Sequence, residues 1–181
     1  MRTSGLAERG ECQGYGGAGG GESAIAPVLV LAIGNPLMAD DGAGQEVLAR
    51  LESVAPEWGS QVEFLDGGTQ GLALLGQFEG RKAVVFLDAV RLGGAAGSVH
   101  VLWGQELLRM GGHATSAHEG SAPDILRALA LLGETPAEVA LVGLEPERIQ
   151  IGIGLSPEVR GSLERAADSA KAAIDRILSA L

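Results

Sequence analysis

Four aspartates stand at or just beyond the ends of apolar segments, where a folded chain could use them for chemistry. They are Asp40, Asp41, Asp66 and Asp88. A later loop, rich in glycine and polar residues, carries His113 and His118. Carboxylates and an imidazole together make a mixed oxygen and nitrogen donor set, which suits a borderline divalent ion such as zinc or nickel. The residue types therefore indicate a metal site, provided that the fold brings these side chains together.

The segments that precede the aspartates are typical of buried strands. Residues 28–33 form an unbroken apolar run that stops at a Gly-Asn-Pro sequence, and two later runs end directly before Asp66 and Asp88. Short runs of this kind, rich in valine and isoleucine, belong to strands that are buried on both faces in parallel sheets. The carboxyl ends of such strands form the edge where ligands bind in open α/β sheets. We therefore expect the aspartates to converge on one edge.

Each aspartate also has a purely structural interpretation. Asp40 or Asp41 could be the N-cap of the helix that follows, because a carboxylate oxygen there accepts a free backbone N–H. Asp66 is followed by two glycines and could simply form a turn. Asp88 ends a wholly apolar strand, so an unpaired carboxylate would be costly there and calls for a metal, a cation or several donors. His100 and His113 can be explained as ordinary loop or surface residues.

Strand and helix patterns alternate along residues 28–181. The predicted strands are residues 28–33, 61–65, 83–87, 98–103, 139–143 and 149–153. Segments with helical spacing of apolar residues begin near residues 42, 72, 121 and 156. This alternation predicts a single three-layer α/β/α domain with a mainly parallel central sheet and helices on both sides.

Residues 1–27 differ from the rest of the chain. They are rich in Gly, Glu and Ser and lack apolar periodicity, which predicts a flexible Gly-rich N-terminal extension. The sequence from Gly14 to Gly19 matches G-x-G-x-x-G, but a dinucleotide fingerprint requires a strand before it and a helix after it. Cys12 is the single cysteine, so neither an intramolecular disulfide nor a CxxC metal site can form.

Composition limits the partners and the location of the protein. The formal net charge is -10, which argues against nucleic acid as a partner because phosphates call for a Lys/Arg surface. No apolar run approaches the roughly 18 residues that a membrane span needs. The N-terminal residues lack the apolar core of a secretory signal. We therefore expect a cytoplasmic protein that binds neither nucleic acid nor membrane.

Several sequence blocks together resemble the hydrogenase maturation endopeptidases, which process the large subunit of nickel–iron hydrogenases. The blocks are Gly34-Asn35-Pro36-Leu37, Asp40-Asp41-Gly42-Ala43-Gly44, Asp66-Gly67-Gly68-Thr69 with Gly71-Leu72, Asp88-Ala89 and Ser116-Ala117-His118, followed downstream by Glu145-Pro146 and Gly154-Leu155-Ser156-Pro157. The likeness covers roughly residues 28–178 in the family's order and spacing. The combination is far more specific than any block alone.

The resemblance implies a particular site and substrate. The family's metal-binding positions fall on Asp41, Asp88 and His118, and Asp66 matches an aspartate that takes part in cleavage. The metal is nickel carried by the substrate, a precursor of the hydrogenase large subunit whose C-terminal extension is removed after nickel insertion. No organic cofactor is expected. With Asp41 assigned to the metal, Asp40 becomes the candidate for the helix cap.

Two other classes of function compete with the endopeptidase. A nickel-binding maturation chaperone or checkpoint protein without peptidase activity would use the same ligands. A nucleotide-binding α/β module is disfavoured, because the Gly-Asn-Pro loop is not a P-loop and no lysine follows it. The residues do not identify a nucleophile, since neither a cysteine nor a G-x-S-x-G elbow is present at the expected site.

Overall fold

The computed structural model describes residues 25–104, 106–107 and 120–181. Its centre is a five-stranded sheet with the strand order β2-β1-β3-β5-β4. The strands are β1 (Val28–Ala32), β2 (Val62–Asp66), β3 (Ala83–Ala89), β4 (Val99–Trp103) and β5 (Glu138–Leu144). Four strands are parallel and the edge strand β4 is antiparallel to β5. The prediction of a mainly parallel sheet is confirmed.

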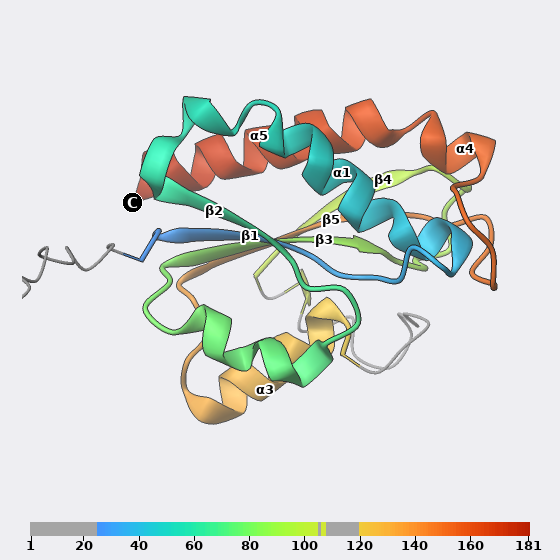
Figure 1. Cartoon of the computed structure of the whole chain (residues 1–181). Helices are drawn as coiled ribbons and strands as arrows, with labels where there is room; N and C mark the ends of the chain where they lie inside the picture. Colours follow the sequence, from blue (N-terminus) through green and yellow to red (C-terminus); the bar gives the residue numbers. More distant parts are fainter. Residues whose placement is uncertain (1–24, 105, 108–119) are drawn as a thin grey trace, which may run out of the picture.

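Helices cover both faces of the sheet (Figure 1), which confirms the predicted three-layer fold. One layer contains α1 (Ala43–Glu52) and α5 (Leu163–Ala180), and the other contains η4 (Gly71–Phe78) and α3 (Ala122–Leu132). The short helices are η1 (Ala39–Gly42), η2 (Ala55–Glu57), η3 (Gly59–Gln61) and α4 (Pro157–Arg160). The predicted helix near residue 72 is a 3₁₀ helix.

The core lies against both faces of β1, β3 and β5, which run through the middle of the sheet. Every residue of β1 and β3 is buried, as their unbroken apolar runs predict. Alternate residues of each strand point to opposite layers, so Val30 packs toward α1 and α5 while Leu31 packs toward η4 and α3. The burial of both faces leaves the strand ends as the place for polar side chains.

The predicted strand at residues 149–153 is wrong. This segment forms only an isolated parallel bridge between Met38 and Gly152 and does not join the sheet. Its isoleucines, Ile151 and Ile153, are almost fully exposed instead of buried. The alternating pattern resembles that of a strand, but Gly154 adopts a positive φ of 90° immediately afterwards and turns the chain toward α4.

Two predicted features fall outside the described residues. They are the extension over residues 1–24, with Cys12 and the glycine pattern, and the loop that carries His113 and His118. Residues 25–27 are described and lead directly into β1. Within the described part of the chain, none of the helices has the length and apolar character needed to cross a membrane.

Candidate functional site

The loop after β1 folds back tightly against its own acidic residues. Gly34 has a φ of 136°, and a Cβ atom on it would lie 2.0 Å from the backbone oxygen of Asp41, so only glycine fits this position. The backbone N–H of Asn35 donates to Oδ2 of Asp41 at 2.7 Å. The two contacts hold η1, with its buried aspartates, over the carboxyl end of β1.

Asp40 does not cap a helix, so this part of the sequence interpretation is wrong. The N-cap of α1 is Gly42, without a side-chain cap. The fully buried carboxylate of Asp40 instead accepts hydrogen bonds from the backbone N–H groups of Glu147, Arg148 and Ser156 at 3.0, 3.0 and 2.6 Å. The hydroxyl of Ser156 donates to it as well, at 3.0 Å. Asp40 therefore ties the first loop to the segment after β5.

Asp41 and Asp88 form a buried pair of carboxylates at the sheet edge. Asp88 lies near the end of the central strand β3, and both residues are completely buried. Burial raises the pKa of Asp88 well above its ordinary value, and the neighbouring charge of Asp41 raises this pKa further. The backbone N–H groups of Ala89 and Ala122 oppose these effects only in part.

The surroundings of Asp88 suit a cation. Among the described residues, neither carboxylate oxygen has a well-aligned hydrogen-bond donor. A buried carboxylate with such weak donors is unfavourable, and a second carboxylate beside it increases the cost. A cation between the two groups would reverse both effects, and carboxylate oxygens are ordinary ligands for divalent metals. The donor chemistry therefore fits a metal ion.

Helix α1 approaches the ends of β1 and β3 closely and fixes their geometry. A Cβ atom on Gly44 would lie 2.5 Å from the backbone oxygen of Leu87 and 2.9 Å from that of Ile33. The first turn of α1 therefore rests directly on the backbone that leads to Asp88. The side chain of Gln45, one residue later, reaches across the next strand end.

Asp66 stands apart from the buried pair. It ends β2, which is separated from β3 by β1, so the backbones of β2 and β3 are about 10 Å apart. Its carboxylate is exposed, and Oδ1 accepts hydrogen bonds from Gln45 Nε2 at 3.2 Å and from the N–H of Gly68 at 2.9 Å. Gln45 also donates to the carbonyl of Gly34 at 3.0 Å. Asp66 is thus oriented at the solvent rim of the site.

Gln45 was missed by the sequence reasoning. It directly follows Gly44 on the first turn of α1, where a polar side chain is ordinary. Its role arises because β2 pairs with β1 in a register that places Asp66 beside Ala32. Only the three-dimensional pairing of the strands reveals this contact.

The comparisons with known proteins decide the family. A family model described as hydrogenase maturation protease matches residues 46–173, a range that includes Asp66, Asp88 and His118. The Hydrogenase 2 maturation protease of Escherichia coli (strain K12) is 35% identical over 150 residues, which cover 81% of this chain and 90% of that protein. The chain belongs to the hydrogenase maturation protease family. The resemblance seen in the sequence, and the prediction of an enzyme, are confirmed.

Solved structures agree with this assignment. The hydrogenase maturating endopeptidase HybD from E. coli superposes with a TM-score of 0.73 at 34% sequence identity, over 82% of this chain and 92% of that one. The NiFe hydrogenase maturation protease HybD from Thermococcus kodakarensis gives a TM-score of 0.65 at 30% identity, over 80% and 96% of the two chains. This hydrogenase maturation protease therefore shares its relatives' fold over most of its length.

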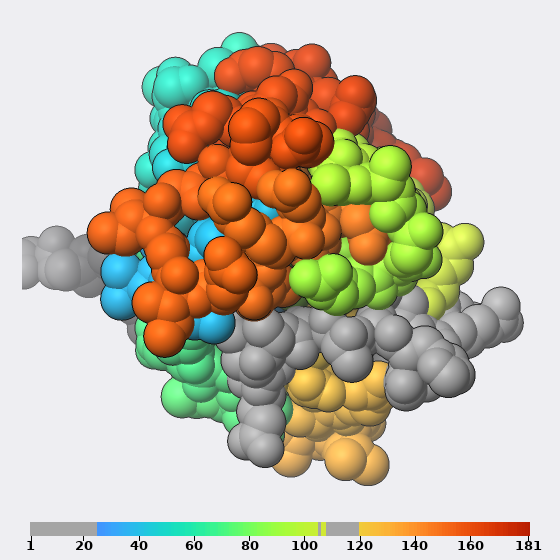
Figure 2. All heavy atoms as spheres, turned by 90° about the vertical axis from the view of Figure 1, so that its right-hand side faces the viewer, coloured from blue at the N-terminus to red at the C-terminus, as the bar shows by residue number. Residues whose placement is uncertain are grey.

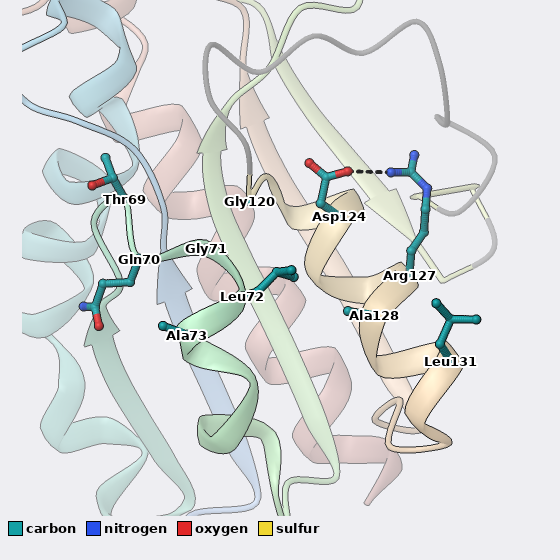
Figure 3. A pocket seen from close by; sticks show the side chains of 10 residues that line it. All are labelled: Thr69, Gln70, Gly71, Leu72, Ala73, Gly120, Asp124, Arg127, Ala128 and Leu131. Atoms are coloured by element: carbon teal, nitrogen blue, oxygen red, sulfur yellow. Dashed lines mark hydrogen bonds and ion pairs between the residues drawn. The ribbon is translucent and has the colours of Figure 1, made fainter.

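The hydrogenase maturation protease also has a pocket of about 710 Å³ between η4 and α3 (Figure 3). Its lining residues are Thr69, Gln70, Gly71, Leu72, Ala73, Gly120, Asp124, Arg127, Ala128 and Leu131. Asp124 accepts hydrogen bonds from Arg127 at 2.6 Å and from the hydroxyl of Ser121 at 2.7 Å, so its charge is compensated. The pocket begins three residues after Asp66 and contains none of the predicted site aspartates.

A further buried carboxylate of this hydrogenase maturation protease lies after β5. Glu145 accepts hydrogen bonds from the N–H groups of Leu92 and Gly93 at 2.9 and 3.3 Å. His100, on strand β4, places Nε2 3.5 Å from Glu145 Oε2. His100 is therefore a partly buried strand residue beside a carboxylate, and not a free surface histidine. Glu145 fixes the turn that follows β3 and Asp88.

Proposed function

We propose that this protein acts in the cytoplasm and removes the C-terminal extension of a hydrogenase large-subunit precursor after nickel has been inserted. In this proposal Asp41, Asp88 and His118 contact the nickel of the substrate, and Asp66 assists attack on the peptide bond. The observation that carries the proposal is Asp88, a completely buried carboxylate with a raised pKa beside Asp41. The family membership supplies the reaction, proteolysis.

The energetics of Asp88 favour a metal that arrives with the substrate. Without a cation, the charged form of the buried Asp88 carboxylate costs the free enzyme free energy at the end of β3. A precursor that carries a divalent ion would lower this cost, whereas a precursor without nickel would not. Such a site would bind completed precursor selectively, because the gain depends on the metal charge and not on the polypeptide alone.

His118 lies outside the described residues, but the described chain on its C-terminal side supports its assignment. Gly120 packs so closely on Gly71 that a Cβ atom would lie 2.4 Å from the Cα of Gly71. The N–H of Ala122 faces Asp88. The described chain four residues after position 118 therefore lies at the sheet edge that carries Asp88.

The position of Asp66 suits a proton acceptor that works from the rim. Its exposed carboxylate accepts hydrogen bonds from Gln45 and Gly68 through Oδ1, so the side chain is oriented while it stays open to solvent. In the proposed reaction the carboxylate takes a proton from the attacking water as the C–O bond forms. The proton then passes to the leaving amine as the C–N bond breaks. The nickel would act only to position the scissile bond near Asp66.

The test is a cleavage assay with nickel-loaded and nickel-free large-subunit precursor side by side, read as loss of mass. We expect cleavage of the loaded precursor only. Asp88→Ala should reduce the rate by at least about 100-fold, because binding and positioning by the metal are lost. Asp168→Ala, the same change at an exposed position of α5, should have the normal rate.

Equal cleavage of both precursors by the unchanged enzyme would remove nickel from the proposal. A normal rate for Asp88→Ala would contradict the role of Asp88. Binding of loaded precursor without any loss of mass would support the non-catalytic chaperone instead.

A further inference from the structure

The side chain of Gln45 connects the two loops that carry the proposed site residues. Its Nε2 group donates to the carbonyl of Gly34 at 3.0 Å and to Asp66 Oδ1 at 3.2 Å. Gly34 belongs to the loop after β1, and Asp66 ends β2. A side-chain amide has two N–H donors, so these contacts use both of them. Gln45 therefore spans the space between two neighbouring strand ends.

The carbonyl that Gln45 contacts belongs to the same peptide group that contacts Asp41. The carbonyl of Gly34 and the N–H of Asn35 are the two polar groups of one planar peptide unit and point in opposite directions. The N–H donates to Asp41 Oδ2 at 2.7 Å, while the carbonyl accepts from Gln45. Asp41, this peptide group, Gln45 and Asp66 are therefore joined by three consecutive hydrogen bonds. We call this chain of contacts the Gln45 link.

The conformation of Gly34 makes the Gln45 link possible. Gly34 has a φ of 136°, which residues with a side chain rarely adopt. Its N–H donates to the carbonyl of Gly68 at 3.0 Å, so the loops after β1 and β2 are also joined through their backbones. Figure 2 looks at the carboxyl ends of the parallel strands and shows the blue loop of residues 34–42 at the surface, beside green residues that follow β2. The link thus lies on the face of the proposed cleavage site.

The partners of Gln45 fix the orientation of its amide group. Turned over, the amide would place Oε1 against two other acceptors, the carbonyl of Gly34 and the carboxylate of Asp66. In the observed orientation Oε1 is buried, and among the described residues it has no hydrogen-bond donor. A buried acceptor without a donor lowers the stability of the fold. Gln45 therefore makes its two donor contacts at a cost in stability, which is expected of a residue kept for function.

We propose that Gln45 is a positioning residue for cleavage, which acts through Asp66 and through the peptide group that contacts Asp41. Among the described residues, both donors to Asp66 bind Oδ1, so Oδ2 stays available for the attacking water. The link fixes this oxygen relative to Asp41, the nickel contact of the proposed function. A scissile bond anchored by nickel then meets the proton acceptor in a set place, and a small misplacement lowers the rate steeply. The inference rests on the proposed function for the roles of the two aspartates.

The test replaces Gln45 by methionine, which is unbranched and of similar length but has no N–H donor. We expect Gln45→Met to lower kcat for nickel-loaded precursor by about 10–100-fold and to leave KM within about threefold, because binding is kept while Asp66 is no longer held. Gln45→Lys keeps N–H donors on a long side chain and should have a higher kcat than Gln45→Met. Gln77→Met, the same change at an exposed position near the end of η4, should leave kcat and KM unchanged.

A double-mutant cycle shows whether Gln45 acts through Asp66. Gln45→Met, Asp66→Ala and the double variant are compared in single-turnover reactions with excess enzyme, so that low residual rates can be measured. Because Gln45 has nothing to position once the carboxylate is gone, the double variant should be as fast as Asp66→Ala within about threefold. Thermal unfolding checks the fold of each variant, and the Tm of Gln45→Met should be nearly unchanged.

The link itself is tested without cleavage, by NMR of the free full-length protein. Gln45→Met should shift the backbone amide resonance of Asn35, because its peptide group loses the hydrogen bond to the carbonyl. Asp66→Ala should shift the side-chain NH2 resonances of Gln45. Gln77→Met should shift neither set of resonances.

A normal kcat in Gln45→Met would overturn the inference, and so would a further tenfold loss when this change is added to Asp66→Ala. A kcat of Gln45→Lys no higher than that of Gln45→Met would overturn it as well, because the N–H donors would then not matter. A change in KM alone would assign Gln45 to binding instead. Failure of the proposed function looks different: Asp66→Ala then cleaves at the normal rate, or the unchanged protein cleaves no precursor, while the resonance shifts of the link remain.

Discussion

Asp40 and Asp88 are both completely buried at the same edge of the sheet, yet their surroundings are opposite. Asp40 accepts three backbone N–H groups and a hydroxyl. Asp88 has no well-aligned donor among the described residues and faces the charge of Asp41. Burial alone therefore does not identify a functional carboxylate. The donors around it distinguish the two residues: Asp40 is compensated within the fold, whereas no well-aligned donor among the described residues compensates Asp88.

The two environments also differ in the reach of their contacts. The groups that bind Asp40 come from residues 107 to 116 positions further along the chain. Asp40 thus acts as a tertiary link that fixes the loop after β1 and the segment after β5 at once. Asp88 lies on the central strand β3 between β1 and β5, where the neighbouring chain offers its carboxylate little compensation. We therefore expect the Asp40 carboxylate to stabilise the folded protein and the Asp88 carboxylate to destabilise it.

Replacing Asp40 by alanine should have the largest effect on stability. Three backbone N–H groups and the hydroxyl of Ser156 would lose a charged acceptor in a buried position. We expect the free energy of unfolding to fall by about 3–5 kcal/mol, as for other broken buried charge networks. Denaturant unfolding measures this. Asp40→Asn, which keeps one carbonyl oxygen, should lose less, and equal losses for both variants would contradict the network.

Asp88→Asn should have the opposite sign. It removes a buried charge that the fold does not compensate, so we expect the free energy of unfolding at pH 8 to rise by about 1–3 kcal/mol. The same change should abolish cleavage of nickel-loaded precursor. A variant that is more stable and inactive is the expected signature of a residue kept for function. Asp168→Asn, at an exposed position of α5, is the control and should change neither property.

The gain from Asp88→Asn should depend on pH. The pKa of Asp88 is raised in the folded state, mainly by burial and then by Asp41. The folded protein then holds the proton of Asp88 more tightly than the unfolded chain does. The contribution of protonated Asp88 to the free energy of unfolding is therefore fully present below the pKa of the unfolded chain, about 4. That contribution is lost as pH rises through the folded pKa. The free energy of unfolding of Asp88→Asn should therefore exceed that of the unchanged protein by little near pH 4 and by more toward pH 8. A stability difference that shrinks toward pH 8 would refute the raised pKa.

The sequence predicted the positions of the strand ends better than the partners of their side chains. Asp66 ends β2 and Asp88 is the last residue but one of β3, close to where their apolar runs predict, because local periodicity indicates where a buried strand stops. Asp40 was misjudged because an N-cap is a local motif, whereas its true donors are more than a hundred residues away. The bridge segment at residues 149–153 was misjudged for the related reason that alternation does not reveal whether a sheet is within reach.

Glu145 is intermediate between the two aspartates and should give the smallest effect. Its side chain is 4% exposed and accepts hydrogen bonds from two backbone N–H groups. His100 Nε2 lies farther from the carboxylate than these donors do, at 3.5 Å. Glu145→Gln keeps the shape and one acceptor oxygen but places an amide NH2 against one of the N–H groups of residues 92 and 93. We expect a loss of about 1 kcal/mol in the free energy of unfolding at pH 7.

Three buried carboxylates would then rank by their donors, with a large loss at Asp40, a small loss at Glu145 and a gain at Asp88. Because Glu145 holds the turn after β3, its change should also loosen the chain just beyond Asp88. Faster amide exchange at Leu92 and Gly93 in Glu145→Gln, with unchanged exchange in β1, would locate the loss at this turn. A loss as large as that of Asp40→Ala would show that the number of donors does not set the ranking.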